Sequence, residues 1–307
     1  MRIVFMGNPS YAIPSLEALT GSRHHIAVIV TSPDKQAGRS LKLTPPPVKE
    51  WAQLQGIPVL QPLRLKDPDF LSALRTWGAD LGVIVGFRIL PPEVIRIFPK
   101  GLINLHFSLL PELRGPAPVQ WAILNGFNRT GISTFLIDDQ VDTGNILLQQ
   151  DVAIGEEEVA TELTERLARL GAQLMVKTLD WWEEGKLTPL PQVGTPTHAP
   201  KISNEMRKID WSSSAEEISR LVRALAYEPG AYTFFRGERV NIYRAVAVPN
   251  TLEALPGTVL EARGDYLVIK AGSGGVHIKE LQRAGKKRMS SSEFLRGAKN
   301  IIGTVWG

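Results

Sequence analysis

The first half of the chain alternates short apolar runs with stretches of helical periodicity. Runs predicted to be strands cover residues 3–6, 26–31, 81–86, 102–106, 132–137 and 146–152, and helical patterns occupy 13–19 and 119–124. Several of these runs are continuously apolar, as is typical of strands covered on both faces of a sheet. This alternation predicts an α/β fold with a doubly wound, mainly parallel, Rossmann-like sheet.

A long amphipathic helix is predicted after the last of these strands. Apolar residues recur every three or four positions along one stripe, at Val159, Leu163, Leu167, Leu170 and Leu174. The acidic run 156–158 stands at the start of this helix, where the helix dipole favours negative charge. The helix is expected to end near Trp182, because prolines and a glycine follow closely and predict a linker over residues 186–204.

The pattern changes after residue 205. One helix is predicted near 215–226, with Ser214 as its N-cap. Short runs with strand character follow at 231–235, 240–248, 257–260, 266–271 and 276–281. Glycines and prolines separate these runs, which predicts a small antiparallel β-barrel, resembling the OB type, or a sandwich. The expected organisation is therefore a catalytic domain over 1–185, a linker over 186–204 and a smaller domain over 205–307.

Composition excludes several classes of protein. Hydrophobic residues make up 43% of the chain and charged residues 21%, as in ordinary globular proteins. The absence of cysteine excludes disulfides, thiolate nucleophiles and cysteine-ligated zinc. No apolar run reaches the roughly 18 residues that a membrane-spanning helix needs, and the N-terminal run is too short for a signal peptide. The cytoplasm is therefore the expected compartment.

Charge is divided unevenly along the chain. Residues 1–200 carry a net charge of −2 and residues 201–307 a net charge of +6, which together give the +4 of the whole chain. A basic C-terminal third indicates a polyanionic partner, with a solvated basic surface as the alternative.

Two polar residues stand at the end of a predicted buried strand. Asn104 and His106 are two positions apart, so their side chains share one face, and open α/β sheets bind ligands at the carboxyl ends of their strands. The stiff segment 108–118 follows, and three carboxylates come later in 137–144, where Asp142 is best placed to turn back toward His106. The alternative is a strand end whose polar groups only satisfy the backbone of the next loop.

The same motifs carry a resemblance to a known family. Ile3–Gly7, Asn104–Pro111 and Val141–Gly144 closely resemble the folate-dependent formyltransferases. Within that superfamily, four C-terminal blocks resemble the methionyl-tRNA formyltransferase family: Lys201–Ser203, Ile209–Ser212, Glu228–Tyr232 and Leu281–Ser290. The similarity runs over essentially the whole chain in the expected order.

This resemblance implies transfer of a formyl group from 10-formyltetrahydrofolate to the α-amino group of methionine on initiator methionyl-tRNA. Asn104 would hydrogen-bond the formyl oxygen, His106 would stabilise the oxyanion, and Asp142 would orient His106 and help to manage the proton. A tetrahedral intermediate needs donors of this kind, and histidine serves well near neutral pH. The formyl group is already activated on nitrogen, so neither a metal nor a covalent nucleophile is required.

The resemblance also assigns binding residues. The folate site would include Ser108, Leu109, Leu110, Pro111, Phe87, Ile89 and Asp138. The segment 86–91 is one residue shorter than the family pattern, so the pterin wall is expected to be reshaped there. The tRNA would contact Lys35, Arg39 and Lys42 in the loop 32–44, and Lys286, Lys287 and Arg288. The alternative for that loop is a mobile surface loop with ordinary lysines.

Three other functions stay open at this point. The first is a related formyltransferase acting on a sugar nucleotide or on glycinamide ribonucleotide, and the second is a hydrolase that releases formate from formylfolate. The third is a noncatalytic tRNA-binding protein. A small acceptor would not require the basic C-terminal third. The expected protein is a monomer with no obligate protein partner and no membrane contact.

Overall fold

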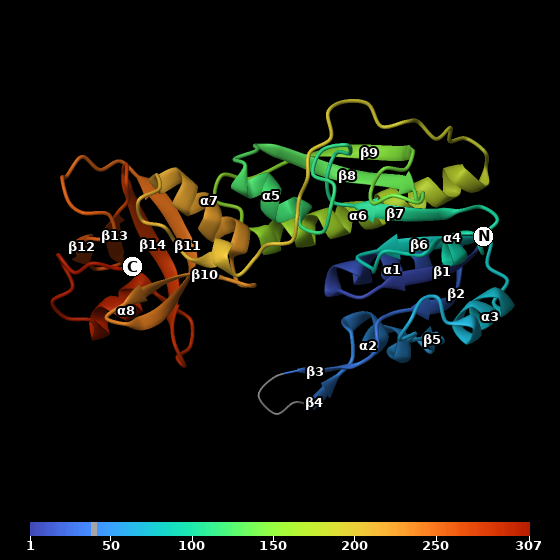
Figure 1. Ribbon diagram of the computed structural model, residues 1–307, viewed down its shortest axis with the longest axis horizontal. Coiled ribbons are helices and arrows are strands. Elements are labelled where there is room, and N and C mark those ends of the chain that lie inside the picture. Colours follow the sequence, from blue (N-terminus) through green and yellow to red (C-terminus); the bar gives the residue numbers. More distant parts are fainter. Residues whose placement is uncertain (38–41) are drawn as a thin grey trace. The chain divides into compact units, whose positions relative to one another are not determined.

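The chain folds into two compact units in a computed structural model that describes residues 1–37 and 42–307. The first unit consists of Met1–Gly115, Thr130–Val152 and Thr164–His198, and the second of Pro116–Arg129, Ala153–Leu163 and Ala199–Gly307. Figure 1 shows the elements of each unit, coloured along the sequence. The predicted limits of 185 and 205 for the two domains stay a prediction.

A seven-stranded sheet forms the centre of the first unit. Its spatial order is β5-β2-β1-β6-β7-β8-β9. The five strands from β5 to β7 are parallel, and β8 is antiparallel to β7, with His106 opposite Ser133. The predicted mainly parallel sheet is therefore confirmed. The strands are β1 (Arg2–Gly7), β2 (His25–Val30), β5 (Val59–Leu60), β6 (Leu81–Val85), β7 (Leu102–His106), β8 (Arg129–Leu136) and β9 (Ile146–Ala153).

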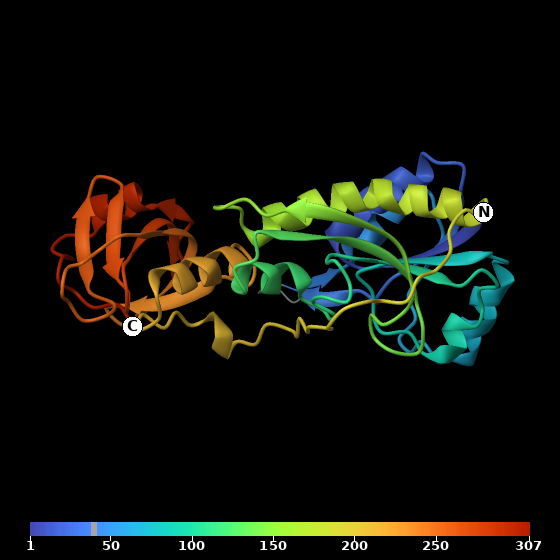
Figure 2. The ribbon, with the colours of Figure 1, turned by 90° about the horizontal axis from the view of Figure 1, so that it is seen from above.

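Helices cover both faces of this sheet, as Figure 2 shows for α6 on one side and α3 and α4 on the other. Val4 and Met6 of β1 belong to an apolar cluster with residues of α3 and α4. On α6, Gly171 lies so close to Leu105 of β7 that an added Cβ would stand 2.7 Å from that side chain. The helices are α1 (Ile13–Thr20), α2 (Pro47–Leu54), α3 (Pro68–Thr76), α4 (Pro92–Ile95) and α6 (Ala160–Glu183). A short hairpin joins β3 (Lys35–Ala37) and β4 (Lys42–Thr44).

The second unit is built on an antiparallel sheet. Its strands run in the order β10-β11-β14-β13-β12, with β15 pairing β14, and the pairings are antiparallel, as the sequence predicts. The strands are β10 (Ala231–Phe235), β11 (Glu238–Val248), β12 (Val259–Arg263), β13 (Tyr266–Lys270), β14 (Gly275–Arg283) and β15 (Met289–Ser290). The helices are α5 (Pro118–Leu124), α7 (Ala215–Leu225) and α8 (Ser291–Gly297).

Aromatic packing and helix capping stabilise this second unit. Phe235 stacks on Trp306 with ring centroids 4.9 Å apart, and Phe294 meets Trp306 edge-on at 5.9 Å. All three side chains are buried, and contacts of this kind add to the gain from apolar burial. Ser214 caps α7 and forms a capping box with Glu217, which confirms the predicted N-cap.

Candidate active site

Asn104 and His106 lie at the carboxyl end of β7, near the centre of the first unit's sheet. Leu102, Ile103 and Leu105 of the same strand are buried, which fixes the strand between its neighbours. Strand alternation turns Asn104 and His106 toward one face. Asn104 is half-buried and His106 is 6% exposed. The strand therefore presents an amide and an imidazole together at the sheet edge where ligands bind in such folds.

The two ring nitrogens of His106 have different neighbours. Nε2 lies 3.0 Å from the carbonyl oxygen of Leu113, and a carbonyl only accepts, so Nε2 carries a hydrogen. Nδ1 lies 3.8 Å from Oδ2 of Asp142. A proton on Nδ1 would complete an ion pair with that carboxylate. His106 and Asp142 thus form a pair that can hold or release a proton beside the β7 end.

Asp142 is held in an unusual backbone conformation. Its φ of 56° is in the left-handed region, which costs a residue other than glycine on the order of 1 kcal/mol or more. The backbone N–H of Gly115 donates to Oδ2 of Asp142 at 2.8 Å, and the side chain is 13% exposed. Two residues after Asp142 the chain requires glycine, because a Cβ on Gly144 would lie 1.6 Å from the carbonyl oxygen of Leu136. The left-handed backbone of Asp142, the tight packing of Gly144 and the hydrogen bond from Gly115 together set the position of the Asp142 carboxylate opposite His106.

The loop after His106 is anchored to β8. Ser133 Oγ donates to the carbonyl of Ser108 at 2.6 Å and accepts the N–H of Leu110 at 3.1 Å. Ser108 Oγ donates to the carbonyl of Glu112 at 2.5 Å. Ser108, Leu110 and Pro111 are buried, and Leu109 is partly exposed. Of the predicted folate residues in this loop, Leu109 is the one with surface to offer a ligand, and the other three shape the wall behind it.

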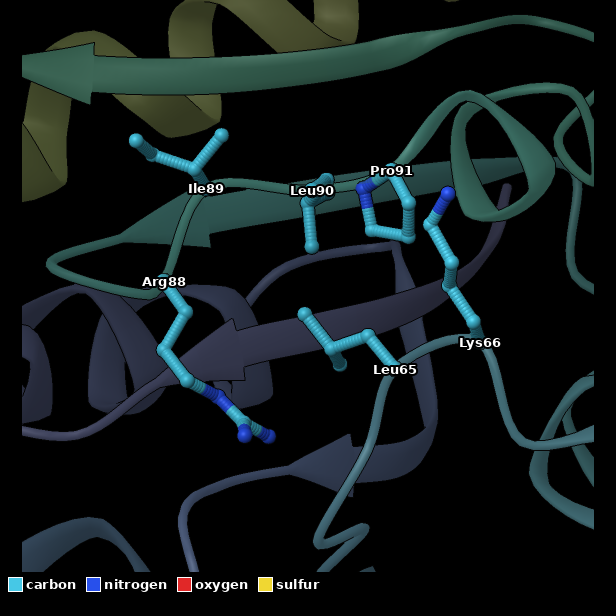
Figure 3. Close-up of a pocket in the computed structure, with 6 residues that line it drawn as sticks. All are labelled: Leu65, Lys66, Arg88, Ile89, Leu90 and Pro91. Atoms are coloured by element: carbon cyan, nitrogen blue, oxygen red, sulfur yellow. The ribbon is translucent and has the colours of Figure 1, made fainter.

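The segment after β6 supplies the other predicted folate residues. Gly86 has φ 62°, and an added Cβ there would meet the hydroxyl of Tyr11 at 2.5 Å. Phe87 is partly buried, whereas Ile89 is 77% exposed. A hollow of about 350 Å³ lies along this segment. Figure 3 shows that Leu65 and Leu90 face one another there and that Ile89 points away from them. A flat apolar ring would find contact surface here.

Arg88 lines this hollow, and Tyr11, which lies beside Gly86, packs on Phe107. The Arg88 guanidinium donates to the carbonyl of Pro62 at 2.9 Å, and burial lowers the pKa of Arg88. Burial also raises the pKa of the Tyr11 phenol, whose ring lies 5.3 Å from that of Phe107. The Phe107 ring, directly after His106, therefore packs against an aromatic side chain of the 3-10 turn Ser10–Ala12 that follows β1.

Asp138 lies in the loop that leads to Asp142. Its Oδ1 accepts the N–H of Gln140 at 3.0 Å and the hydroxyl of Thr143 at 2.7 Å. Asp138 is exposed, so these bonds shape the loop and leave part of the carboxylate accessible to solvent. Its predicted contact with folate stays a prediction.

The predicted tRNA residues that the structure describes fall in two places, the β3–β4 hairpin and the turn between β14 and β15. Lys35 is exposed in β3, and Lys42 begins β4. Arg39 lies outside the described residues. Lys286, Lys287 and Arg288 are exposed in the turn between β14 and β15, where Arg288 lies 4.8 Å from the ring centroid of Tyr227 and 3.9 Å from a carboxylate oxygen of Glu280.

Sequence reasoning missed the residues that support this site. Ser133 belongs to β8, where a small polar residue in a buried strand gives little sign of its role. Thr197 accepts the N–H of Leu113 through its hydroxyl at 2.8 Å, and Gln192 donates to the carbonyl of Asp142 at 2.9 Å. Both lie in the proline-rich segment predicted as a linker, where only the tertiary fold reveals a contact 50 or more residues away.

None of the helices in residues 1–37 and 42–307 combines the length and the apolar character needed to cross a bilayer.

The chain is similar in sequence and in fold to known formyltransferases and related proteins. The methionyl-tRNA formyltransferase of Pelotomaculum thermopropionicum is 42% identical over 309 residues, covering 100% of this chain and 99% of its own. That of Caldanaerobacter subterraneus subsp. tengcongensis is 42% identical over 308 residues, covering 99% of both chains. Aquifex aeolicus HypX, solved in complex with tetrahydrofolic acid, matches 99% of this chain with a TM-score of 0.68 and 20% identity. This chain spans 48% of HypX, and at that identity the likeness bears on the fold alone.

Two family profiles cover most of the sequence. The profile described as formyl transferase matches residues 1–179, and that described as formyl transferase, C-terminal domain, matches residues 201–299. The first spans the sheet that carries His106 and Asp142, and the second spans the antiparallel unit. The chain therefore belongs to the formyl transferase family.

Proposed function

We propose that this chain transfers the formyl group of 10-formyltetrahydrofolate to the α-amino group of methionine on initiator methionyl-tRNA. One observation carries the proposal: relatives named methionyl-tRNA formyltransferase match the chain from end to end at 42% identity. The match includes the antiparallel second unit, and a rival with a small acceptor gives no reason for the basic charge there.

The reaction begins with attack of the uncharged methionyl amine on the formyl carbon. A new C–N bond forms, the carbonyl oxygen becomes an oxyanion, and the tetrahedral intermediate then loses the folate N10. The amine gives up a proton, and N10 gains one as it leaves. The chain must therefore stabilise one negative oxygen and move one proton, which are tasks for preorganised donors and a titrating pair.

We assign these tasks to three residues. Asn104 donates its carboxamide N–H to the formyl oxygen, and His106, protonated on Nδ1, stabilises the oxyanion. Asp142 orients the imidazole, accepts the proton that the amine releases and passes it on to N10 as the folate leaves. Support comes from the 3.8 Å separation of His106 and Asp142 and from the shared face of Asn104 and His106. Both side chains of the pair are largely buried, at 7% and 13% exposure, and low solvent access strengthens such interactions.

Formylfolate binding is proposed for the two segments that flank the β7 end. The exposed Ile89, with Phe87 beside it, offers apolar surface for the pterin, and Leu109 offers more from the other side. Asp138 contributes an exposed carboxylate that accepts hydrogen bonds from ring N–H groups. Ser108, Leu110 and Pro111 keep this wall in place from beneath.

tRNA binding is proposed for Lys35, Arg39 and Lys42 in the hairpin loop and for Lys286, Lys287 and Arg288 in the second unit. Cations that contact phosphates give affinity but little base specificity. Discrimination between initiator and elongator tRNA is therefore assigned to the acceptor end. We further propose that the chain acts as a monomer in the cytoplasm, which gel filtration and cell fractionation would test.

The decisive experiment is an acceptor assay with formylfolate labelled in the formyl group. Charged initiator methionyl-tRNA is the test acceptor, and charged elongator methionyl-tRNA is the control. We expect transfer to the initiator and little to the elongator. Release of formate without any tRNA would indicate a hydrolase, and tRNA binding without transfer would indicate a noncatalytic protein. No transfer to the initiator would contradict the proposal.

A further inference from the structure

Gln192 uses its whole carboxamide to join two parts of the candidate active site. Its Nε2 donates to the carbonyls of Asp142 and Gly144, each at 2.9 Å, and its Oε1 accepts from Nε and Nη2 of Arg114 at 3.1 and 2.6 Å. A carboxamide has two N–H donors and one oxygen with two lone pairs, so all its hydrogen-bonding capacity is used. Such saturation is unusual for a side chain in a proline-rich surface segment.

Its surroundings set Gln192 apart from the rest of that segment. Gln192 is partly buried, whereas the next residue, Val193, is 86% exposed. The segment is tied to the first unit at two further points: Leu190 pairs with Ile146, and Thr197 bonds the loop before Arg114. Residues 186–198 therefore act as a strap, and Gln192 is the position where its side chain turns inward.

The chemistry of the partners fixes which way the amide faces. A guanidinium only donates, so the oxygen of Gln192 must face Arg114. The NH₂ group must then face the two carbonyls, which only accept. This orientation does not depend on telling oxygen from nitrogen in the side chain. Glutamate at this position would keep the bond to Arg114 and lose both donors to the carbonyls.

These bonds hold both ends of the turn that carries Asp142. The left-handed backbone of Asp142 is unfavourable for a residue other than glycine, and Gly144 lies against the Leu136 carbonyl. The turn therefore keeps this conformation only while contacts with neighbouring residues stabilise it. Arg114 is followed by Gly115, whose N–H binds the Asp142 carboxylate at 2.8 Å. Two adjacent residues therefore hold Asp142. Arg114 is linked to the main chain of Asp142 through Gln192, and the backbone N–H of Gly115 binds the Asp142 carboxylate.

We infer that Gln192 is a positioning residue for formyl transfer: together with Arg114 it fixes the Asp142 carboxylate opposite His106. The inference rests on the proposed function, because it assigns Asp142 a part in the reaction. Gln192 bonds the backbone of the turn and acts only through Asp142. Losing its donors should let the turn relax and move the carboxylate away from the 3.8 Å position, with little effect on substrate binding surfaces.

The test compares Gln192→Glu and Gln192→Ala with the neighbouring control Val193→Ala. Because a displacement of about 1 Å at reacting groups can cost on the order of 100-fold, we expect kcat to fall by roughly 10- to 100-fold in both Gln192 variants. KM for formylfolate and for tRNA should stay unchanged. The melting temperature of Gln192→Glu should fall less than that of Gln192→Ala, because the new carboxylate still pairs with Arg114 although the two carbonyls lose their donor. Val193→Ala should match the wild type in all four quantities.

A merely structural role predicts a different pattern. The activity loss in both Gln192 variants would then follow the unfolded fraction measured by circular dichroism, and the folded fraction would keep the kcat of the wild type. That result overturns the inference. Wild-type protein that transfers no formyl group defeats the proposed function and the inference with it, whereas active wild type with a fully active Gln192→Glu overturns the inference alone.

Arg114→Lys tests the second member of the pair. Lysine is a point charge and cannot place two donors on one oxygen as arginine does here. Members of one network show non-additive effects, so the Arg114→Lys/Gln192→Glu double variant should lose little more kcat than the worse single variant. If the kcat losses of the two single variants were fully additive in the double variant, Arg114 and Gln192 would not act together on Asp142.

Discussion

At the scale of single residues, His106 is defined by what binds each of its ring nitrogens. The Leu113 carbonyl occupies Nε2 from a backbone that is itself in the left-handed region, with φ 57°. Nδ1 faces Oδ2 of Asp142 at 3.8 Å. One nitrogen thus orients the ring, and the proposed mechanism assigns the chemistry to the other.

In the proposed mechanism, replacing His106 by alanine removes one donor to the oxyanion. Because a single donor of this kind contributes about 10²–10³ in kcat, we expect His106→Ala to lose that factor while the Kd for formylfolate is little changed. Steady-state kinetics and fluorescence titration with folate measure the two quantities. His25→Ala, at an exposed position where β2 begins, serves as the control. Full activity in His106→Ala would remove this residue from the mechanism.

Gly144 tests the geometry of the turn independently of its chemistry. A Cβ here would overlap the Leu136 carbonyl at 1.6 Å, which no side-chain movement relieves. We expect Gly144→Ala to lower both the melting temperature and kcat, because the backbone that carries Asp142 must shift. Gly297→Ala is the matched control, since no atom lies within 4 Å of the added Cβ. In a helix that change should be neutral or stabilise by about 0.5–1 kcal/mol. An unaltered Gly144→Ala protein would refute the tight turn.

At the scale of elements, the base of the β3–β4 hairpin is held by a charged cluster. Lys49 of α2 donates to both carboxylate oxygens of Asp34 at 2.8 Å, and Gln61 donates to one of them at 2.7 Å and to the carbonyl of Ser32 at 2.8 Å. The hydrogen bond from Gln61 and then that from Lys49 lower the pKa of Asp34. The cluster thus anchors the segment that leads from β2 to Lys35 and the proposed tRNA-binding loop.

The sign of the Asp34 shift gives a pH dependence. Because the folded pKa lies below the ordinary 3.8, the stabilisation is present above that pH and is lost as the pH falls through the lower folded value. Asp34→Asn should therefore be less stable than wild type in urea unfolding at pH 7, and the two should converge in strong acid. Glu253→Gln, at an exposed position, should show no such convergence. A constant difference at all pH values would contradict the assignment.

The elements themselves were predictable where their patterns are long or their caps distinctive. Continuous apolar runs indicate β1, β2, β6 and β7, and the 3.6-residue stripe indicates α6, because burial on both faces or along one stripe demands those patterns. Sequence reasoning missed α2, α3 and α8, which have only seven to nine residues. Two turns of helix give too few repeats to reveal a period, and tertiary packing stabilises them.

At the scale of the whole molecule, the uneven charge predicts a salt dependence. Each phosphate contact adds about 1 to the slope of log affinity against log salt. We expect the Lys286→Gln/Lys287→Gln variant to lose about 2 from that slope for tRNA, while KM for formylfolate stays the same. Lys100→Gln, exposed in the first unit, is the control. An unchanged slope in the double variant would remove this turn from the tRNA interface.

The sequence by itself determined the architecture, the family and the neighbourhood of the site, because burial patterns and short motifs depend on residues near one another in the chain. The motif Asp142–Gly144 is visible in the sequence and indicates the family, but strand geometry does not predict the distance between Asp142 and His106. The tertiary structure decided that distance, the neighbour of each His106 nitrogen and the contacts of Gln192, which lies 50 residues from Asp142. Contacts across such separations depend on how the loops close over the sheet, and a single sequence carries no periodic signal for them.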